Sequence, residues 1–164
     1  MIRVVYSVLF SLSFACLVGC TSTAPAVAAQ ADGEQAIAAS EVPASGLGPQ
    51  ALAPGDCGLF LWSKTDESSF IFFSRAVSGV AVFKPEEEVL NLQQIGTGGT
   101  IFGQFNTQQS YAVGDGSLVE VTFDAGDTLT GGQRISDGLI TITDREGWRT
   151  KLPVLGLRAC MPEG

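Results

Sequence analysis

The side chains of this 164-residue chain that could do chemistry are carboxylates and thiols, because the sequence contains no histidine. That absence excludes a Ser-His-Asp triad, a Cys-His pair and imidazole ligation of a metal. The acidic residues that could converge into the carboxylate pair required for glycoside hydrolysis are Asp124, Asp127, Asp144 and Glu146. Nearly every acid, however, lies in a turn signal or in the run at residues 86–88, where acids ordinarily cap turns and keep the surface soluble. We therefore expect no catalytic residue, no metal site and no cofactor.

Two short runs have the composition of ligand-binding loops but not the spacing. Gly96–Thr100 is rich in glycine, yet neither a Lys-Ser or Lys-Thr pair nor a predicted helix follows it, as a phosphate-binding loop requires. We interpret it as a flexible turn. Asp124–Asp127 offers oxygen ligands without the spacing of an EF-hand. We interpret that run as a hairpin turn.

A tryptophan and two arginines beside a predicted turn are the best candidates for recognition. Trp148 follows the turn signal Arg145-Glu146-Gly147 and precedes Arg149. An arginine can bind a carboxylate through two parallel hydrogen bonds, and an indole can stack on a sugar or an apolar face. We predict that Arg145, Trp148 and Arg149 bind a ligand or partner. The alternative is a core tryptophan flanked by surface ion pairs.

Residues 1–20 form a short hydrophobic segment that ends in a cysteine. Its apolar run is shorter than the about 20 residues that span a bilayer and has the length of a signal-peptide core. The ending Leu17-Val18-Gly19-Cys20 resembles the lipobox of bacterial lipoproteins. The resemblance implies that residues 1–19 are a signal peptide, and that Cys20 becomes the first residue, with acyl chains such as palmitate on its sulfur and its amino group.

An acyl anchor at Cys20 implies a place in the bacterial envelope. In enterobacterial lipoproteins an Asp after the cysteine retains the protein in the inner membrane, whereas Thr21 follows here. The resemblance thus implies the outer membrane, with the protein facing the periplasm or the cell surface, and two or three acyl chains make a stable anchor. The alternative is a secretory signal cleaved after Ala26-Val27-Ala28, which would release a soluble chain.

Residues 20–54 comprise the lipidated N-terminus and a predicted tether, and residues 55–164 comprise the globular domain. The tether is rich in Ala, Pro and Gly and has no aromatic residue, so it cannot bury enough apolar surface and should be disordered. Once Arg3 is removed with the signal peptide, eight basic side chains remain against 17 acidic ones, a net charge of −9. Because nucleic-acid binding needs a clustered basic face, we expect no nucleic-acid partner.

Two cysteines, Cys57 and Cys160, remain for the domain once Cys16 is removed and Cys20 is lipidated. They lie in its first and last predicted strands, and the envelope is oxidising enough to pair them. On the loop-entropy model a disulfide that closes a loop of this length stabilises the fold by about 4–5 kcal/mol. The alternative is a pair of buried free thiols.

The domain shows a period of two, which is typical of half-buried strands. The clearest alternation is at Val119, Val121 and Phe123, and a second follows at Leu139–Thr143. The other candidate strands are Gly58–Ser63, Ser69–Arg75, Val77–Phe83, Val89–Ile95, Thr100–Asn106, Ser110–Val113, Thr130–Ile135, Trp148–Leu152 and Val154–Cys160.

The turn signals between these strands include Asp115-Gly116 and Asp137-Gly138. Lys84–Gln94 is predicted to be a loop or one short helix, and Phe70, Phe72 and Phe73 are interpreted as core. The sequence therefore predicts an all-β fold, either a small antiparallel β-barrel or a two-sheet sandwich.

In its layout the chain is similar to small β-barrel envelope lipoproteins, including lysozyme inhibitors, which carry a cysteine near each end of the domain. No specific family motif aligns, so no residue role is transferred. We expect a non-enzymatic envelope lipoprotein, anchored in the membrane by lipid, whose disulfide-closed domain binds an envelope protein or glycan. The alternatives are an assembly accessory of a membrane protein complex and a hydrolase with two acids about 5–10 Å apart in a cleft.

Overall fold

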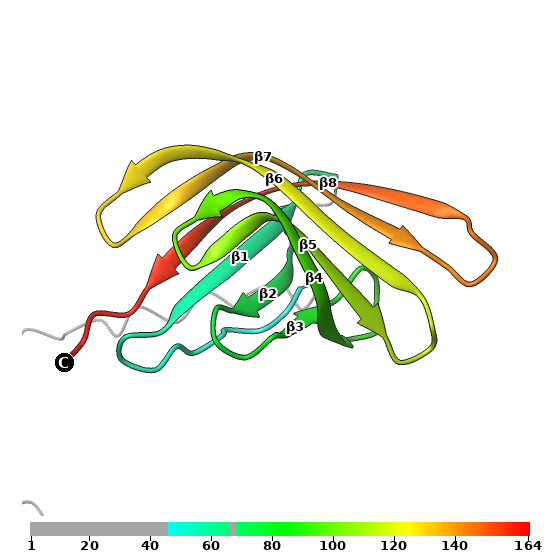
Figure 1. Cartoon of the computed structure of the whole chain (residues 1–164), viewed down its shortest axis with the longest axis horizontal. Coiled ribbons are helices and arrows are strands. Elements are labelled where there is room, and N and C mark those ends of the chain that lie inside the picture. The colour runs from blue at the N-terminus through cyan, green and yellow to red at the C-terminus, as the bar shows by residue number, and fades with distance from the viewer. Residues whose placement is uncertain (1–45, 66–67) are drawn as a thin grey trace, which may run out of the picture. The chain divides into compact units, whose positions relative to one another are not determined.

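The computed structural model describes residues 46–65 and 68–164, which form an all-β domain (Figure 1). The tether residues 20–45, Cys20 and the predicted signal peptide lie outside the described residues. The eight strands are β1 (Cys57–Ser63), β2 (Phe70–Arg75), β3 (Val80–Phe83), β4 (Leu90–Phe102), β5 (Phe105–Val113), β6 (Leu118–Leu129), β7 (Gly132–Thr143) and β8 (Arg149–Cys160).

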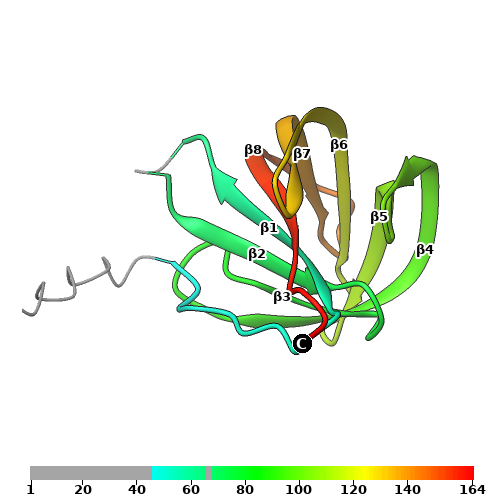
Figure 2. The ribbon, with the colours of Figure 1, turned by 90° about the vertical axis from the view of Figure 1, so that its left-hand side faces the viewer.

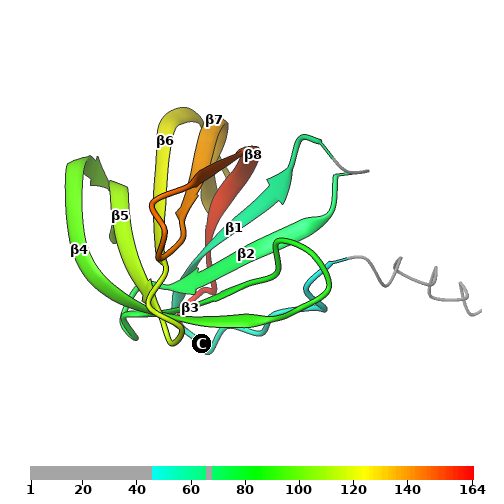
Figure 3. The same ribbon diagram turned by 90° about the vertical axis from the view of Figure 1, so that its right-hand side faces the viewer.

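The strands form a closed barrel in chain order. Each strand pairs antiparallel with the next one, and β8 returns to pair with β1 over the whole length of β1, from Cys57 opposite Cys160 to Ser63 opposite Val154. Figures 2 and 3 show β1, β2 and β3 side by side, with β8 continuing the sheet on the other side of β1. Of the two predicted architectures, the antiparallel barrel is confirmed.

Several predicted strands are parts of longer ones. Gly96–Thr100, predicted to be a flexible turn, lies inside β4, where the register with β5 shifts between Gly98 and Ile101. Asp137-Gly138, also predicted to be a turn, lies inside β7 at a register shift against β8. A register shift of this kind is a β-bulge, which bends a strand without ending it. These two predictions are wrong because bulges and turns use the same residue types.

The turns that follow β2, β4, β5, β6 and β7 each contain a glycine with positive φ. The β6–β7 turn is at residues 130–131, where Gly131 has φ +79°, so the turn predicted at Asp124–Asp127 is wrong and that run belongs to β6. The turns predicted around Gly116 (φ +95°) and Gly147 (φ +88°) are confirmed. Residues 84–89, part of the predicted loop or short helix, connect β3 to β4 as a loop.

The interior of the barrel is filled by apolar side chains. Val119, Val121 and Phe123 alternate with exposed residues along β6 and are at most 6% exposed, as their period of two predicts. The largest fully buried side chains include Tyr111, Phe72 and Phe83, which come from β5, β2 and β3. An interior packed in this way is the core of the domain rather than a lumen for a ligand.

A polar network lies within this core. The Tyr111 hydroxyl donates to Gln109 Oε1 at 2.6 Å and lies 3.3 Å from Ser74 Oγ. Gln94 Nε2 also donates to Gln109 Oε1, at 3.3 Å, and Gln109 Nε2 donates to the Asn106 carbonyl at 3.1 Å. Buried polar groups are tolerated when they are satisfied in this way.

A disulfide joins the first and last strands. Cys57 and Cys160 are directly opposite each other in the β1–β8 register and their sulfurs are bonded, with a sequence separation of 103. The predicted pairing is confirmed. Backbone hydrogen bonds continue past the disulfide, because Met161 N donates to Asp56 O and Gly55 N donates to Met161 O.

Residues 46–54, which the sequence analysis placed in the tether, lie against the outside of the barrel. Leu47 is buried, and its amide donates to the carbonyl of Phe70 in β2. The Arg75 guanidinium donates to the Ala51 carbonyl at 3.0 Å. This segment covers outward-facing aromatic side chains. Its backbone and its few apolar residues are therefore ordered by tertiary contacts, which leave no periodic hydrophobic pattern in the sequence.

Candidate functional site

The β7–β8 turn presents the predicted recognition residues at one end of the barrel. Trp148 is 77% exposed, so it is not a core tryptophan. Its amide donates to Asp144 Oδ1 at 2.8 Å, and its carbonyl accepts from the Asp144 amide at 3.1 Å. A third bond runs from Gly147 N to Asp144 O. The indole is therefore held in solvent by a turn whose backbone is fixed through Asp144.

Arg145 connects this turn to the β5–β6 turn. Its side chain lies against Gly116, where an added Cβ would lie 3.4 Å from Arg145 Cδ. The pKa of Asp115 is lowered, mainly because its carboxylate accepts from the Ser117 amide and hydroxyl, and secondarily by the charge of Arg145. Arg149 is exposed at the start of β8. We call the β5–β6 and β7–β8 turns, with Arg145, Trp148 and Arg149, the hairpin end.

The four acids considered for a carboxylate pair do not form one site. Asp144 and Glu146 belong to the β7–β8 turn. This turn follows Thr143, which pairs with Leu118 at the start of β6. Asp124 lies six positions from Leu118 along β6, which is roughly 20 Å at the rise of an extended strand. Asp127 lies farther along the same strand. These four acids therefore do not supply the carboxylate pair that the hydrolase alternative requires.

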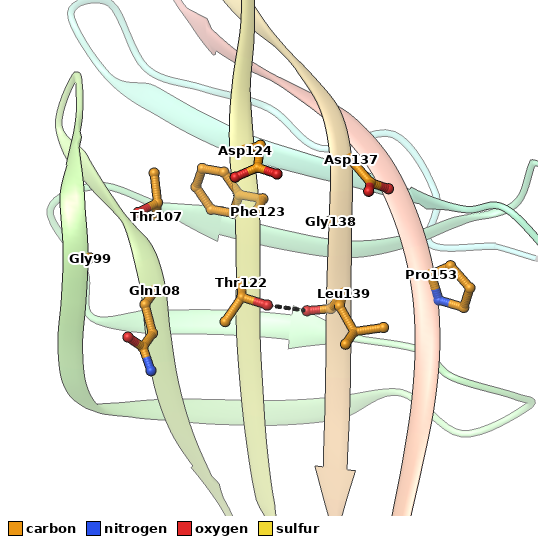
Figure 4. Close-up of a pocket in the computed structure, with 10 residues that line it drawn as sticks. All are labelled: Gly99, Thr107, Gln108, Thr122, Phe123, Asp124, Asp137, Gly138, Leu139 and Pro153. Atoms are coloured by element: carbon orange, nitrogen blue, oxygen red, sulfur yellow. Dashed lines mark hydrogen bonds between the residues drawn. The ribbon is translucent and has the colours of Figure 1, made fainter.

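The structure pairs Asp124 with Asp137 instead. The two residues are opposite each other in β6 and β7 and line a hollow of about 500 Å³ (Figure 4). The hollow lies where β5 stops pairing with β6, beyond the pair Gln108 and Thr122. Sequence reasoning missed Asp137 because it interpreted Asp137-Gly138 as a turn, whereas the bulge places it in a strand.

This pair does not favour acid catalysis. Lys64 Nζ lies 2.6 Å from Asp137 Oδ1, and this contact lowers the pKa of Asp137. A general acid needs the opposite shift, which comes from burial in apolar surroundings. The Asp137 side chain is 72% exposed. Within residues 46–65 and 68–164, no cluster of three or more His, Cys, Asp or Glu side chains is placed to hold a metal ion.

A second hollow, of about 450 Å³, lies on the outer face of β1, β7 and β8. Its lining is mainly apolar and consists of Trp62, Leu129, Arg134, Ile135, Ser136, Leu155, Gly156 and Leu157. We call it the outer groove. Sequence reasoning did not find it, because its residues come from four strands and meet only through the register of the closed barrel.

Comparisons with known proteins give no further lead: no protein-family model, curated protein or solved structure matches this chain. In the part of the chain that the structure describes, no helix has the length and apolar character needed to cross a membrane.

Proposed function

We propose that this chain is a non-enzymatic lipoprotein of the bacterial outer membrane, whose barrel binds another envelope component through the hairpin end. The observation that carries the proposal is Trp148, a large aromatic side chain that is 77% exposed on a turn fixed by three hydrogen bonds to Asp144. Tryptophan and arginine are the residues that most often dominate binding energy at interfaces.

The fixed turn matters because ordering a binding surface costs free energy. An interface loses about 0.5–1.5 kcal/mol for each rotamer-rich side chain that it immobilises, and more when a loop must be ordered. Here the backbone at Trp148 is already held by Asp144. An indole has only two side-chain torsions, so it offers a large contact area at a small entropic cost.

The charges of the hairpin end suggest the chemistry of the partner. Arg145 and Arg149 are exposed on a chain whose formal net charge is −8. The same turns also carry Asp115, Asp144 and Glu146, of which Asp115 and Asp144 already accept backbone hydrogen bonds within their own turns. The guanidinium groups of the two arginines would attract carboxylates, on an acidic protein surface or on a glycan, while Trp148 packs on an apolar or sugar face. We propose an envelope protein with an acidic, partly apolar surface as the partner, and a glycan as the competing candidate.

The proposed anchor rests on the lipobox at Leu17–Cys20, and the disulfide supports the compartment. A bonded Cys57–Cys160 pair is typical of proteins that mature outside the reducing cytosol. We propose that Cys20 carries the acyl chains and that the remaining residues up to 45 connect it to the barrel.

Intact mass tests the anchor. Protein extracted from the membranes of the native cell should have the mass of a chain that begins at Cys20 plus its acyl chains, and should gain 2 Da on reduction, as one disulfide takes up two hydrogens. A soluble, unmodified chain that begins after Ala28 would refute the lipoprotein assignment while leaving the binding proposal standing.

Site-specific photo-crosslinking tests the binding surface. A photoreactive residue at position 146, where Glu146 is exposed in the same turn as Trp148, should form in the native cell a discrete adduct that mass spectrometry can identify. Position 77 is the matched control, because Val77 is 81% exposed in the β2–β3 turn at the Cys57 end of β1, whereas the hairpin end lies beyond Ser63. The proposal would be refuted if both positions formed adducts or if neither position did. This applies to adducts with protein and to adducts with peptidoglycan fragments.

A substitution completes this test. Trp148→Ala should abolish the adduct of the crosslinker at position 146, while changing the free energy of unfolding by less than about 0.5 kcal/mol, because the side chain is exposed. Urea unfolding measures the second quantity. A loss of stability of several kcal/mol would mean that Trp148 is a structural residue.

A further inference from the structure

The outward positions of β1 and β8 are apolar. Phe60 is paired with Leu157, and Trp62 is paired with Leu155, in the register of these two strands. The inward side chains alternate with them, as Leu59 and Leu61 do at 0% exposure. In an antiparallel barrel whose core is inside, the outward side chains are normally polar. Two adjacent rows of apolar side chains on the outside of the barrel are therefore expected to be shielded from water by another group.

One half of this outer face has its cover within the chain. The rings of Phe60 and Phe73 of β2 pack at a tilt, with centroids 5.0 Å apart, and the rings of Trp62 and Phe70 are likewise tilted, 5.1 Å apart. The segment 46–54 lies beside them, because the Leu47 amide donates to the Phe70 carbonyl and Leu52 lies with Phe60 and Phe73 at Gly58. Leu47 is only 7% exposed and Phe73 only 4%. The β2 side of the outer face is thus partly covered.

The other half is the outer groove. Trp62, Leu155 and Leu157 form its floor across β1 and β8, and Leu129 contributes from the end of β6. Leu155 and Leu129 are 41% and 40% exposed. The hollow of about 450 Å³ has the size of a small-molecule site, for which about 300–1,000 Å³ is usual. A protein partner would instead need a surface of about 800 Å² on each side.

Arg134 is the charged group of this groove. It is exposed in β7, opposite Leu157 of β8, and makes no ion pair within residues 46–65 and 68–164. The nearby cation Lys64, in contrast, is neutralised by Asp137. An apolar hollow with one unneutralised arginine at its wall complements a ligand that has an apolar chain and an anionic end.

We propose that the outer groove binds a single-chain amphiphile with a carboxylate head, such as a fatty acid. Its chain lies on Trp62, Leu155 and Leu157, and its carboxylate accepts hydrogen bonds from Arg134. This site is separate from the hairpin end, so it stands or falls independently of the proposed partner binding.

Tryptophan fluorescence tests the proposal, because Trp62 and Trp148 are the only tryptophans in the chain. In a Trp148→Phe background the emission reports Trp62 alone, on the floor of the groove. Dodecanoate, added to the folded protein below its micelle-forming concentration, should change this emission with saturation. Dodecyltrimethylammonium, which has the same chain and a cationic head, should bind at least about tenfold more weakly.

Two substitutions separate the head from the chain. Arg134→Gln should weaken dodecanoate binding about three- to tenfold, the range that corresponds to a partly exposed charge-assisted hydrogen bond, and should leave dodecanol binding unchanged. Leu155→Ser should weaken both ligands. Lys151→Gln is the matched control, because Lys151 is an exposed cation on β8 that does not line the groove. It should leave both affinities unchanged.

Several results would overturn the proposal. The first is that dodecanoate causes no saturable change in the Trp62 emission, and the second is that the anionic and cationic amphiphiles bind with equal affinity. The third is that Lys151→Gln weakens dodecanoate binding as much as Arg134→Gln does. Far-ultraviolet circular dichroism and the thermal midpoint confirm that each variant is folded before its affinity is compared. A groove that binds protein instead would show as a discrete protein adduct of a photoreactive residue at position 136, where Ser136 lines the groove, without any dodecanoate binding by the parent protein.

Discussion

Tyr111 shows how one polar side chain is accommodated in an apolar barrel. It is fully buried, and burial raises its pKa to about 12, although the hydrogen bond with Ser74 acts in the opposite direction. Its proton is held by Gln109 Oε1 at 2.6 Å. The residue therefore contributes to stability only while it is protonated.

This raised pKa predicts a loss of stability in alkali. An unfolded chain releases the tyrosine proton near pH 10, whereas the native chain keeps it to about pH 12. The contribution is thus complete below pH 10 and is lost as the pH rises from 10 through 12, by about 3 kcal/mol in all for a difference of about two pKa units. Urea unfolding at increasing pH should show this loss, and Tyr111→Phe should remove it.

The same experiment has an internal control. Tyr111 is the only tyrosine after Tyr6 in the sequence, so tyrosinate absorbance of a chain without residues 1–19 reports this side chain alone. The difference between the parent protein and Tyr111→Phe isolates the contribution of the Tyr111 hydroxyl. A native tyrosinate midpoint near 10 would contradict the structural assignment of a buried hydroxyl.

At the scale of the element, the strands depend on glycines where two backbones approach closely. Gly156 in β8 lies between Leu61 of β1 and Ile135 of β7. A Cβ at this position would collide with the carbonyl oxygen of Phe60 and with the Leu61 side chain. Gly103 in the β4–β5 turn is needed for a different reason: its φ is +62°, and the Arg158 guanidinium, which donates to Gln104 Oε1 at 3.1 Å, lies where a Cβ would be.

Gly156→Ala should therefore destabilise the barrel by about 2–3 kcal/mol, since overpacking of this kind forces strand backbones apart. Gly114→Ala is the control, because nothing lies within 4 Å of a Cβ there and its φ is not positive. It should change the free energy of unfolding by less than about 0.5 kcal/mol. Urea denaturation compares the two, and equal effects would show that the β1–β8 approach is not tight.

At the scale of the whole molecule, closure of the barrel brings together distant parts of the chain. Every strand pair except β1–β8 joins strands that are consecutive in the sequence. β1 and β8, in contrast, meet at the disulfide across a sequence separation of 103. Forming such a contact costs loop-closure entropy, which the disulfide removes from the unfolded state.

Replacing both cysteines, as Cys57→Ala with Cys160→Ala, should lower the free energy of unfolding by about 4 kcal/mol on the loop-entropy model. The midpoint of urea unfolding measures this loss. A reductant should lower the midpoint of the parent protein to a similar extent and leave the double variant unchanged. If the reductant has no effect on the parent protein, closure is stabilised by the β1–β8 hydrogen bonds alone.

The fold class, the disulfide and the alternation in β6 could be predicted from the sequence. Each of them follows either from a local hydrophobic pattern or from the number of cysteines. Val119, Val121 and Phe123 are buried as predicted. Strand ends were less predictable. The bulges at Gly98–Ile101 and Ile135–Gly138 use glycine and aspartate as turns do, so fragments that looked separate are continuous strands.

The residues of the candidate sites also differ in how far the sequence could predict them, according to whether they are close in sequence or meet only through strand pairing. Arg145, Trp148 and Arg149 are neighbours in sequence, and the structure places all three at the hairpin end. Asp124 and Asp137, or Trp62 and Leu155, are neighbours only through strand register. Register between strands distant in the chain depends on barrel closure and bulges, which a single sequence does not reveal.

The position of the disulfide also determines how the domain bears a mechanical load. A pull on the chain at residue 46 first acts on the contacts of Leu47 with β2, which are hydrogen bonds and packing. Farther along, it reaches Cys57, where a covalent bond passes the force straight into Cys160 at the end of β8. The outer segment can therefore peel away under tension while the barrel behind the disulfide keeps both of its terminal strands together.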